Sequence, residues 1–176
     1  MATRKIQQLN RAESHVLEAI QNVAFDKPGV LPTARGLSHF GEHALGWMGL
    51  AACGAVIDKR RRRGWVTTGA AAFVSHAISV IVKRIVRRRR PDFPYVKVGV
   101  GTPSRLSFPS SHSTSTTAFL VSAARVTGQP LLLAGIPVMM LSRMVLGVHY
   151  PSDTAIGAAI GAATATAAET LERKIA

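Results

Sequence analysis

The chain has 176 residues, a length typical of one domain, and its 22 Lys and Arg residues against 9 Asp and Glu give it a net charge of +13. Because 47% of its residues are hydrophobic, the composition excludes a disordered chain, and the single cysteine, Cys53, excludes a disulfide framework. The basic residues stand in short blocks between long apolar runs, unlike the scattered charges of an ordinary soluble enzyme. Two classes remain: a nucleic-acid-binding protein, and a membrane protein with basic loops.

Residues 1–37 are polar and mixed in charge, with apolar residues at helical spacing. These apolar positions are Ile6, Leu9, Val16, Leu17, Ile20 and Val23. The spacing predicts an amphipathic helix that either lies on a membrane surface or packs on a helical bundle. Pro28, Gly29 and Pro32 predict a break over residues 26–35.

Apolar runs follow the N-terminal segment, and charged or Pro-rich connections separate most of them. The runs cover residues 40–57, 65–82, 116–126, 131–148 and 155–168. A membrane-spanning helix needs about 20 apolar residues, a length that the second and fourth runs approach. The others fit only if Ser, Thr and Gly are accepted inside a span, as membrane helices accept them.

This pattern predicts an all-α fold, a polytopic membrane helical bundle of about five spans preceded by the amphipathic helix. We expect residues 1–37 to form an interfacial segment, residues 38–168 the membrane domain and residues 169–176 a charged tail. Gly157 and Gly161 in the last run have the spacing that lets two helices approach closely, although chance explains such a pair equally well in an Ala/Gly-rich run.

Lys83 and Arg90 form the first of three clusters that could carry chemistry. They are seven residues apart, so on a continuous helix they share one face with Arg87, and Pro91 then disfavours any continuation. Both side chains donate hydrogen bonds to phosphate oxygens, Arg in a bidentate manner. The alternative is a juxtamembrane basic block that fixes topology or attracts anionic lipids.

The second cluster is the sequence Pro109-Ser110-Ser111-His112 before an apolar run. It predicts a helix start capped by Ser110 or Ser111. Free backbone amides at a helix start suit a phosphate group, and His112 in the first turn could donate a proton to a leaving oxygen. The alternative is a capping sequence with an incidental histidine.

The third cluster combines Arg143, His149 and Asp153 around Pro151. Arg143 interrupts an apolar run, where a charge is costly and usually functional. Pro151 predicts a helix start, and Asp153 in its first turn could fold back to orient His149, as the carboxylate does in hydrolytic triads. A capping carboxylate beside a hydrogen-bonded histidine is the equally weighted alternative.

If the chain threads the membrane alternately, all three clusters meet at one membrane face. Together they supply cations, a helix start, a nucleophile and an acid, which is what phosphoryl transfer requires. The sequence has no carboxylate cluster typical of a divalent-metal site, so we expect no metal and no cofactor.

The order and spacing of the clusters resemble the type 2 phosphatidic acid phosphatase family. The matching motifs are Lys83-x6-Arg90-Pro91, Pro109-Ser110-Ser111-His112 and Ser142-Arg143-x5-His149-x3-Asp153. The family has Gly where this chain has Ser111, which adds a Cβ in the second motif. The resemblance covers roughly residues 38–168 and implies a metal-independent phosphatase built as a helical membrane bundle.

The resemblance also implies the roles of individual residues. His149 would attack phosphorus to give a phosphohistidine, Asp153 would orient it, and His112 would protonate the leaving alkoxide. The phosphate-binding residues would be Lys83, Arg90, Ser110, Arg143 and the backbone near Ser111. Vanadium-dependent haloperoxidases share these motifs, but the membrane character and small size of this chain disfavour that chemistry.

A narrower resemblance, to the actinobacterial branch of the family, rests on the sequence Ser38-His39-Phe40-Gly41-Glu42-His43. It implies dephosphorylation of decaprenylphosphoryl-5-phosphoribose for the arabinan of the cell wall. Phosphatidic acid, phosphatidylglycerophosphate and polyprenyl diphosphates are the alternative substrates, because the motifs themselves do not select a lipid.

We therefore expect a multi-pass integral protein of the cell membrane. Its partners would be a lipid phosphate substrate and membrane lipids, with a homo-oligomer left open. A nucleic-acid partner is not expected, because few aromatic residues lie near the basic blocks and the apolar runs would be insoluble. A non-catalytic lipid-binding relative remains as an alternative that the intact motifs disfavour.

Overall fold

The computed structural model describes residues 2–175, and the regular structure of these residues is helical. The α-helices are α1 (Ala2–Ala24), α2 (Val30–Phe40), α3 (Leu45–Ile57), α4 (Arg62–Val86), α5 (Ser111–Thr127), α6 (Gly135–Val145) and α7 (Pro151–Ile175). Short 3₁₀ turns over residues 42–44, 59–61 and 130–134 join some of them. The predicted all-α class is confirmed.

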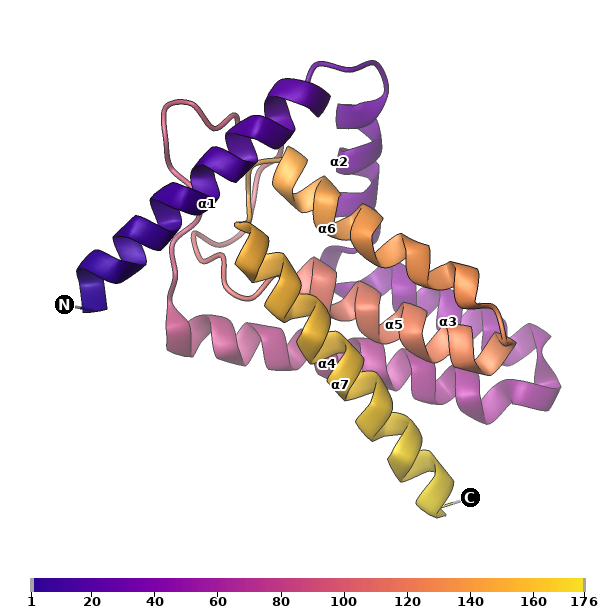
Figure 1. Cartoon of the computed structure of the whole chain (residues 1–176). Helices are drawn as coiled ribbons and strands as arrows, with labels where there is room; N and C mark the ends of the chain where they lie inside the picture. Colours follow the sequence, from indigo (N-terminus) through magenta and orange to yellow (C-terminus); the bar gives the residue numbers. More distant parts are fainter. Residues whose placement is uncertain (1, 176) are drawn as a thin grey trace.

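Helix α5 is the centre of the bundle. It has its most extensive contacts with α7 and α4, while α3 packs mainly on α4 and also reaches α5 through Trp47 and Phe119 (Figure 1). Every residue from Ser113 to Leu120 is buried. Most of them are Ser, Thr or Ala, whose small side chains let the neighbouring helices approach, and hydroxyls such as that of Thr114 bond back to the helix's own carbonyls.

The two glycines of the last apolar run both face α5. A Cβ at Gly157 would lie 2.8 Å from the carbonyl oxygen of Ser110, and one at Gly161 would lie 2.9 Å from Cβ of Thr117. Real Cβ atoms essentially never come so close to another heavy atom. The glycine pair is therefore used for close helix packing within the chain, between α7 and α5.

Helix α4 is the candidate membrane span of the described residues. Together with the preceding turn it covers Lys59–Val86 and contains an 18-residue stretch with a mean hydropathy of 1.6, while Pro130–Val145 forms a shorter apolar helix. The other runs do not pass the same test of length and composition, so about five spans remains a prediction. Large apolar side chains are nevertheless exposed on several helices, among them Leu50, Val56, Val66, Phe73, Ile81 and Val138.

Helix α1 confirms the predicted amphipathic helix and packs on the bundle. Figure 1 shows it lying across one end of the bundle, where α6 ends and α7 begins. Leu17 is fully buried, and the side-chain amide of Gln21 donates to the carbonyl oxygens of Lys97, at 2.7 Å, and Val145, at 2.9 Å. These contacts fix the loops at that end.

The chain departs from the predicted break over residues 26–35. Only residues 25–29 are non-helical, with Gly29 in the left-handed region at φ 81°, and α2 begins at Val30. Pro32 lies in the first turn of α2, where its missing N–H removes no helical hydrogen bond. At the other end of the chain, α7 continues through the charged residues 169–174.

Candidate active site

The three predicted clusters meet at the end of the bundle that α1 covers. There α4 ends, the connection over residues 87–110 folds back, and α5 and α7 begin (Figure 1). A cavity of about 320 Å³ opens at this point. The predicted site residues among those that line it are Lys83, Arg90, Ser111, His112, Arg143 and His149.

Arg90 reaches the cavity from the connection and not from a helix. Helix α4 ends at Val86, because Arg87 adopts the left-handed conformation at φ 55° and closes the helix by donating to the carbonyl of Lys83. The predicted shared helix face of Lys83, Arg87 and Arg90 is therefore wrong. Lys83 and Arg90 instead come together because the chain after α4 turns back toward α5.

The Arg90 guanidinium is held by backbone carbonyls on two sides. Its Nε donates to the carbonyl oxygen of Ser104 at 2.8 Å, and its Nη1 donates to that of Val148 at 2.6 Å. Nη1 also lies 3.2 Å from Nε2 of His149. Burial lowers the pKa of Arg90 to about 10, so it remains a cation at neutral pH.

Lys83 places a positive charge at the cavity and also holds the backbone that lines it by hydrogen bonds. Its Nζ donates to three carbonyl oxygens, those of Leu106 at 3.3 Å, Ser107 at 3.2 Å and Pro109 at 2.9 Å. The ammonium therefore fixes the segment that leads into α5 while its positive charge stays beside the cavity.

His149 is only 2% exposed and lies between this cationic wall and Asp153. Its Nδ1 is 3.7 Å from Oδ2 of Asp153, longer than a hydrogen bond, and its Nε2 is on the side of Arg90. Burial first, and then the positive charges of Arg90, Arg143 and Lys83, lower the pKa of His149 well below its usual range. The ring is therefore neutral at neutral pH and keeps a lone pair.

Asp153 does fold back from the first turn of α7, as its position after Pro151 predicts. Its Oδ2 accepts a hydrogen bond from the backbone N–H of Tyr150 at 2.9 Å, and its Oδ1 pairs with Nη1 of Arg88 at 2.9 Å. The carboxylate is fully buried, with His149 and the side chain of Ser107 also beside it.

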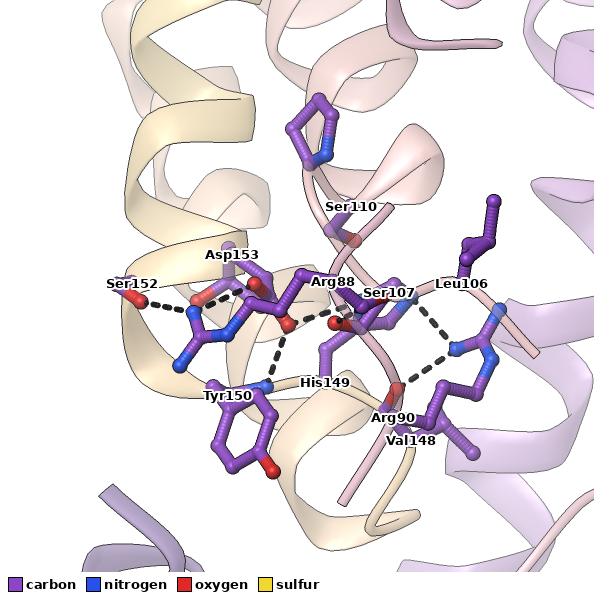
Figure 2. A network of polar contacts seen from close by, with 12 residues as sticks. Arg88, Arg90, Leu106, Ser107, Ser110, Val148, His149, Tyr150, Ser152 and Asp153 are labelled. Carbon is purple, nitrogen blue, oxygen red and sulfur yellow. Dashed lines mark hydrogen bonds and ion pairs between the residues drawn. The ribbon is translucent and has the colours of Figure 1, made fainter. Parts of the chain in front are cut away.

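Arg88 is the central site residue that the sequence reasoning missed. Figure 2 shows it extending along the start of α7, with its guanidinium beside Ser152 and Asp153. It also forms an ion pair with Glu13 of α1 and lies over the ring of Tyr150, 4.0 Å from the centroid. A single side chain thus pairs with two buried carboxylates and ties α1 to the residue behind His149.

The sequence contained only a weak indication of this role. Residues 87–90 are four consecutive arginines, and nothing in the sequence distinguishes the one that points inward. Glu13 is one of only nine acidic residues, and a buried cation needs such a partner.

His112 is oriented by α2. Its Nε2 is 2.9 Å from the carbonyl oxygen of Ser38, which accepts the ring N–H, so Nδ1 keeps the lone pair of the neutral ring. No sequence pattern linked these two residues, because 74 positions separate them.

The two serines of the second motif have different surroundings. Ser110 caps α5 by accepting from the backbone N–H of Ser113 at 3.3 Å, and it is not among the residues that line the cavity. Ser111, which replaces the family's glycine, is the first residue of α5 and has no positive φ. Its hydroxyl accepts from that of Ser79 at 2.8 Å, so the additional Cβ is accommodated.

Arg143 completes the cationic wall from α6. It is 1% exposed, and its Nε and Nη1 have no hydrogen-bond partner among the described residues. Buried donors without partners are costly, and an anion in the cavity would satisfy them. Across residues 2–175, no group of three or more His, Cys, Asp or Glu side chains is arranged to hold a metal ion.

This geometry agrees with the comparison with known protein families. The model of the PAP2 superfamily matches residues 64–174, well over half of the chain. The chain belongs to the PAP2 superfamily. The family expected from the three motifs is thereby confirmed, and with it the expected class of enzyme, a phosphatase.

Two curated relatives of this PAP2 chain carry the same description, decaprenylphosphoryl-5-phosphoribose phosphatase. The protein from Mycobacterium tuberculosis is 58% identical over 152 residues, which cover 86% of each chain. The one from Mycolicibacterium smegmatis is 55% identical over 147 residues, covering 84% of this chain and 82% of the relative.

Two solved structures share the fold at low sequence identity. A transmembrane PAP2-type phosphatidylglycerolphosphate phosphatase from Bacillus subtilis superimposes with a TM-score of 0.71 at 21% identity, over 94% of this chain and 88% of the other. LpxE from Aquifex aeolicus superimposes with a TM-score of 0.70 at 17% identity, over 89% of this chain and 93% of the other. The bundle is thus the fold of known membrane phosphatases.

We expect replacement of Arg88 by Met to destabilise the protein by about 3–5 kcal/mol, because Glu13 and Asp153 are then buried without a counter-charge. Thermal unfolding in detergent measures the change. Arg89→Met is the matched control, since the neighbouring Arg89 side chain is exposed and has no ion pair among the described residues. Equal stability of the two variants would contradict this role of Arg88.

Proposed function

We propose that this PAP2 phosphatase hydrolyses the 5-phosphate of decaprenylphosphoryl-5-phosphoribose through a phosphohistidine on His149. The observation that carries the proposal is the convergence of three cations and two histidines on one cavity. The substrate follows from the two mycobacterial relatives, which match more than four fifths of this chain at over half identity.

His149 is the proposed nucleophile because its ring is neutral and one nitrogen faces the cations. Its Nε2 would attack phosphorus while the bond between phosphorus and the ribose 5-oxygen breaks. Asp153, near Nδ1, would stabilise the positive charge that develops on the ring. Arg88 acts through Asp153 and is a positioning residue.

His112 is the proposed general acid. Because the carbonyl oxygen of Ser38 accepts from its Nε2, the proton for the leaving 5-oxygen would come from Nδ1. In the second step the same nitrogen would take a proton from water, and the resulting hydroxide would attack phosphorus and release His149 and inorganic phosphate. The two steps consume one water and leave His112 protonated for the next cycle.

The phosphoryl oxygens would be held by Arg143, Arg90 and Lys83. The two unpartnered nitrogens of Arg143 can form a bidentate contact. Backbone amides at Ser111 would add donors at the start of α5. Ser110 would contribute through the turn that it caps, because its hydroxyl is engaged with Ser113.

The cavity extends past these residues to a second polar group formed by Glu42, His43 and His76. The rings of His43 and His76 pack edge to face with centroids 5.8 Å apart. A ribose presents two adjacent hydroxyls, for which a carboxylate and imidazoles are suitable partners. Arg84, which is exposed at the same cavity, would pair with the phosphodiester that joins the ribose to the lipid.

We also propose a multi-pass position in the plasma membrane, with about five helices crossing the bilayer. The exposed apolar residues of α3, α4 and α6 and the membrane phosphatases that share the fold support this placement. The catalytic cavity would then lie at one membrane surface, where a lipid headgroup can enter while its prenyl chain stays in the bilayer.

Replacement of His149 by Ala should lower phosphate release from decaprenylphosphoryl-5-phosphoribose by about 10³-fold or more without unfolding the protein, because the attacking nitrogen is lost. His112→Ala should cost about 10²–10⁴-fold on this substrate but much less on an aryl phosphate, whose leaving group needs no proton. Phosphate-release kinetics measure both, with phosphatidic acid and phosphatidylglycerophosphate as competing substrates. Undiminished turnover by the His149 variant, or faster turnover of either competitor by the native chain, would contradict the proposal.

The acid limb of the kcat/KM profile should depend on Arg143. Burial, then Arg90 and then Arg143 lower the pKa of His149, so Arg143→Gln should raise that pKa and extend protonation of the ring to higher pH. We expect the acid limb to move upward by about 1 pH unit. The ionisation of the substrate phosphate is the same for both enzymes and cancels in the comparison. An unshifted limb would refute the assignment of His149.

Glu42→Gln should raise KM for the ribose-containing substrate by about tenfold, because a hydroxyl loses a charged acceptor. The effect on a phosphatidate, which presents acyl esters in place of the diol, should be clearly smaller. Steady-state kinetics on the two lipids give the ratio, and Glu18→Gln on α1, outside the cavity, is the control. Equal losses on both lipids would remove Glu42 from ribose recognition.

A further inference from the structure

A second cavity, of about 560 Å³, lies at the end of the bundle opposite the catalytic cavity. It is formed where α4 begins and α5 and α7 end, and it shares no residue with the catalytic cavity. Its lining includes the whole basic block over residues 59–63, together with Arg125 and Arg173. The proposed phosphatase reaction uses none of these residues.

The charges in this cavity are not balanced. Arg125 and Arg173 pair with Glu169, at 2.6 Å and 2.5 Å, and Arg61 is 3.7 Å from Asp58. Four other cations have no acidic partner in the part of the chain that the structure describes: Lys59, Arg60, Arg62 and Arg63. The cavity therefore presents an excess of positive charge that attracts an anion.

A buried polar group in the same lining also lacks a partner. Ser122 of α5 is 7% exposed, and its hydroxyl forms no hydrogen bond to any described residue. It lies behind the basic block, where α4 passes close to α5: a Cβ at Gly64 would come within 2.8 Å of the Val126 side chain. A ligand that carries hydrogen-bond acceptors would satisfy Ser122 and the cations together.

An apolar groove continues from the basic cavity along α4 and α7. It has a volume of about 710 Å³ and shares Thr67 and Glu172 with the cavity. The other residues that line it are apolar apart from Thr164, and the larger ones include Val66, Val74, Ile78, Ile160 and Leu171. The basic cavity and the apolar groove are therefore adjacent, as are the charged headgroup and the hydrocarbon chains of a lipid.

We propose that the cavity binds the phosphate of an anionic membrane phospholipid, with an acyl chain in the groove between α4 and α7. The excess of cations selects a negative headgroup over a zwitterionic one. The adjoining groove favours a lipid over free phosphate, because a free ion would leave the apolar surface uncovered. The site is structural and separate from the reaction, so it stands even if the proposed substrate is wrong.

The test uses the full chain in detergent and measures thermal unfolding as phosphatidylglycerol or phosphatidylcholine is added to the micelles. Phosphatidylglycerol at about 100 times its Kd should raise the unfolding temperature by about 5–10 °C, and phosphatidylcholine should raise it much less. Inorganic phosphate, added alone, distinguishes a lipid from a free ion. Native mass spectrometry of the same samples counts retained lipids and detects any dimer.

The double variant Arg62→Gln/Arg63→Gln should lose the shift with phosphatidylglycerol, and Ser122→Ala should reduce it. Lys5→Gln/Lys27→Gln removes the same charge from exposed positions on other segments and should keep the shift. Equal shifts with both lipids, an equal shift with inorganic phosphate, or a full shift in the Arg62 and Arg63 variant would each overturn the proposal. A groove closed by a second copy of the chain, with no lipid retained, would also overturn it.

Discussion

The repulsion among three cations at one cavity is the constraint on which the rest of the site depends. Arg143 is buried, and Lys83 and Arg90 are half-buried, so solvent screens their charges only in part. Backbone carbonyls hold Lys83 and Arg90 in place without neutralising them. An anion between these three side chains would offset their mutual repulsion, which is the property that a phosphatase needs.

The same positive charge contributes to the neutrality of His149 and explains why the neighbouring carboxylate needs a separate partner. Burial first, and then the cations, lower the pKa of His149, and the cations would also attract Asp153 if nothing held it. Arg88 and the backbone N–H of Tyr150 hold the carboxylate on the far side of the ring. The site thus has two layers, cations in front of His149 and a compensated ion pair behind it.

The sequence was sufficient for the helical class, the family and the cationic and histidine side chains that converge on the cavity, because these depend on apolar runs and on short motifs with fixed spacing. It misplaced Arg90, because a helix end depends on one left-handed residue, Arg87, which no propensity marks among four arginines. It expected a break at Pro32 that the first turn of α2 tolerates. It missed Arg88 with Glu13, and Ser38 with His112, because those contacts join segments that lie far apart in the chain and follow only from how the helices pack.

The contacts of α1 and α2 show that the structural unit around the catalytic cavity extends beyond the region matched by the family model. The region that the superfamily model matches begins at residue 64, yet Glu13, the Gln21 amide and the carbonyl of Ser38 all reach across that boundary to the catalytic end. A fragment limited to residues 64–174 would contain every motif residue. It would still lack the groups of the first two helices that orient two of these residues. In this chain the motif residues lie within the matched region, while the N-terminal helices α1 and α2 complete the surroundings of the site.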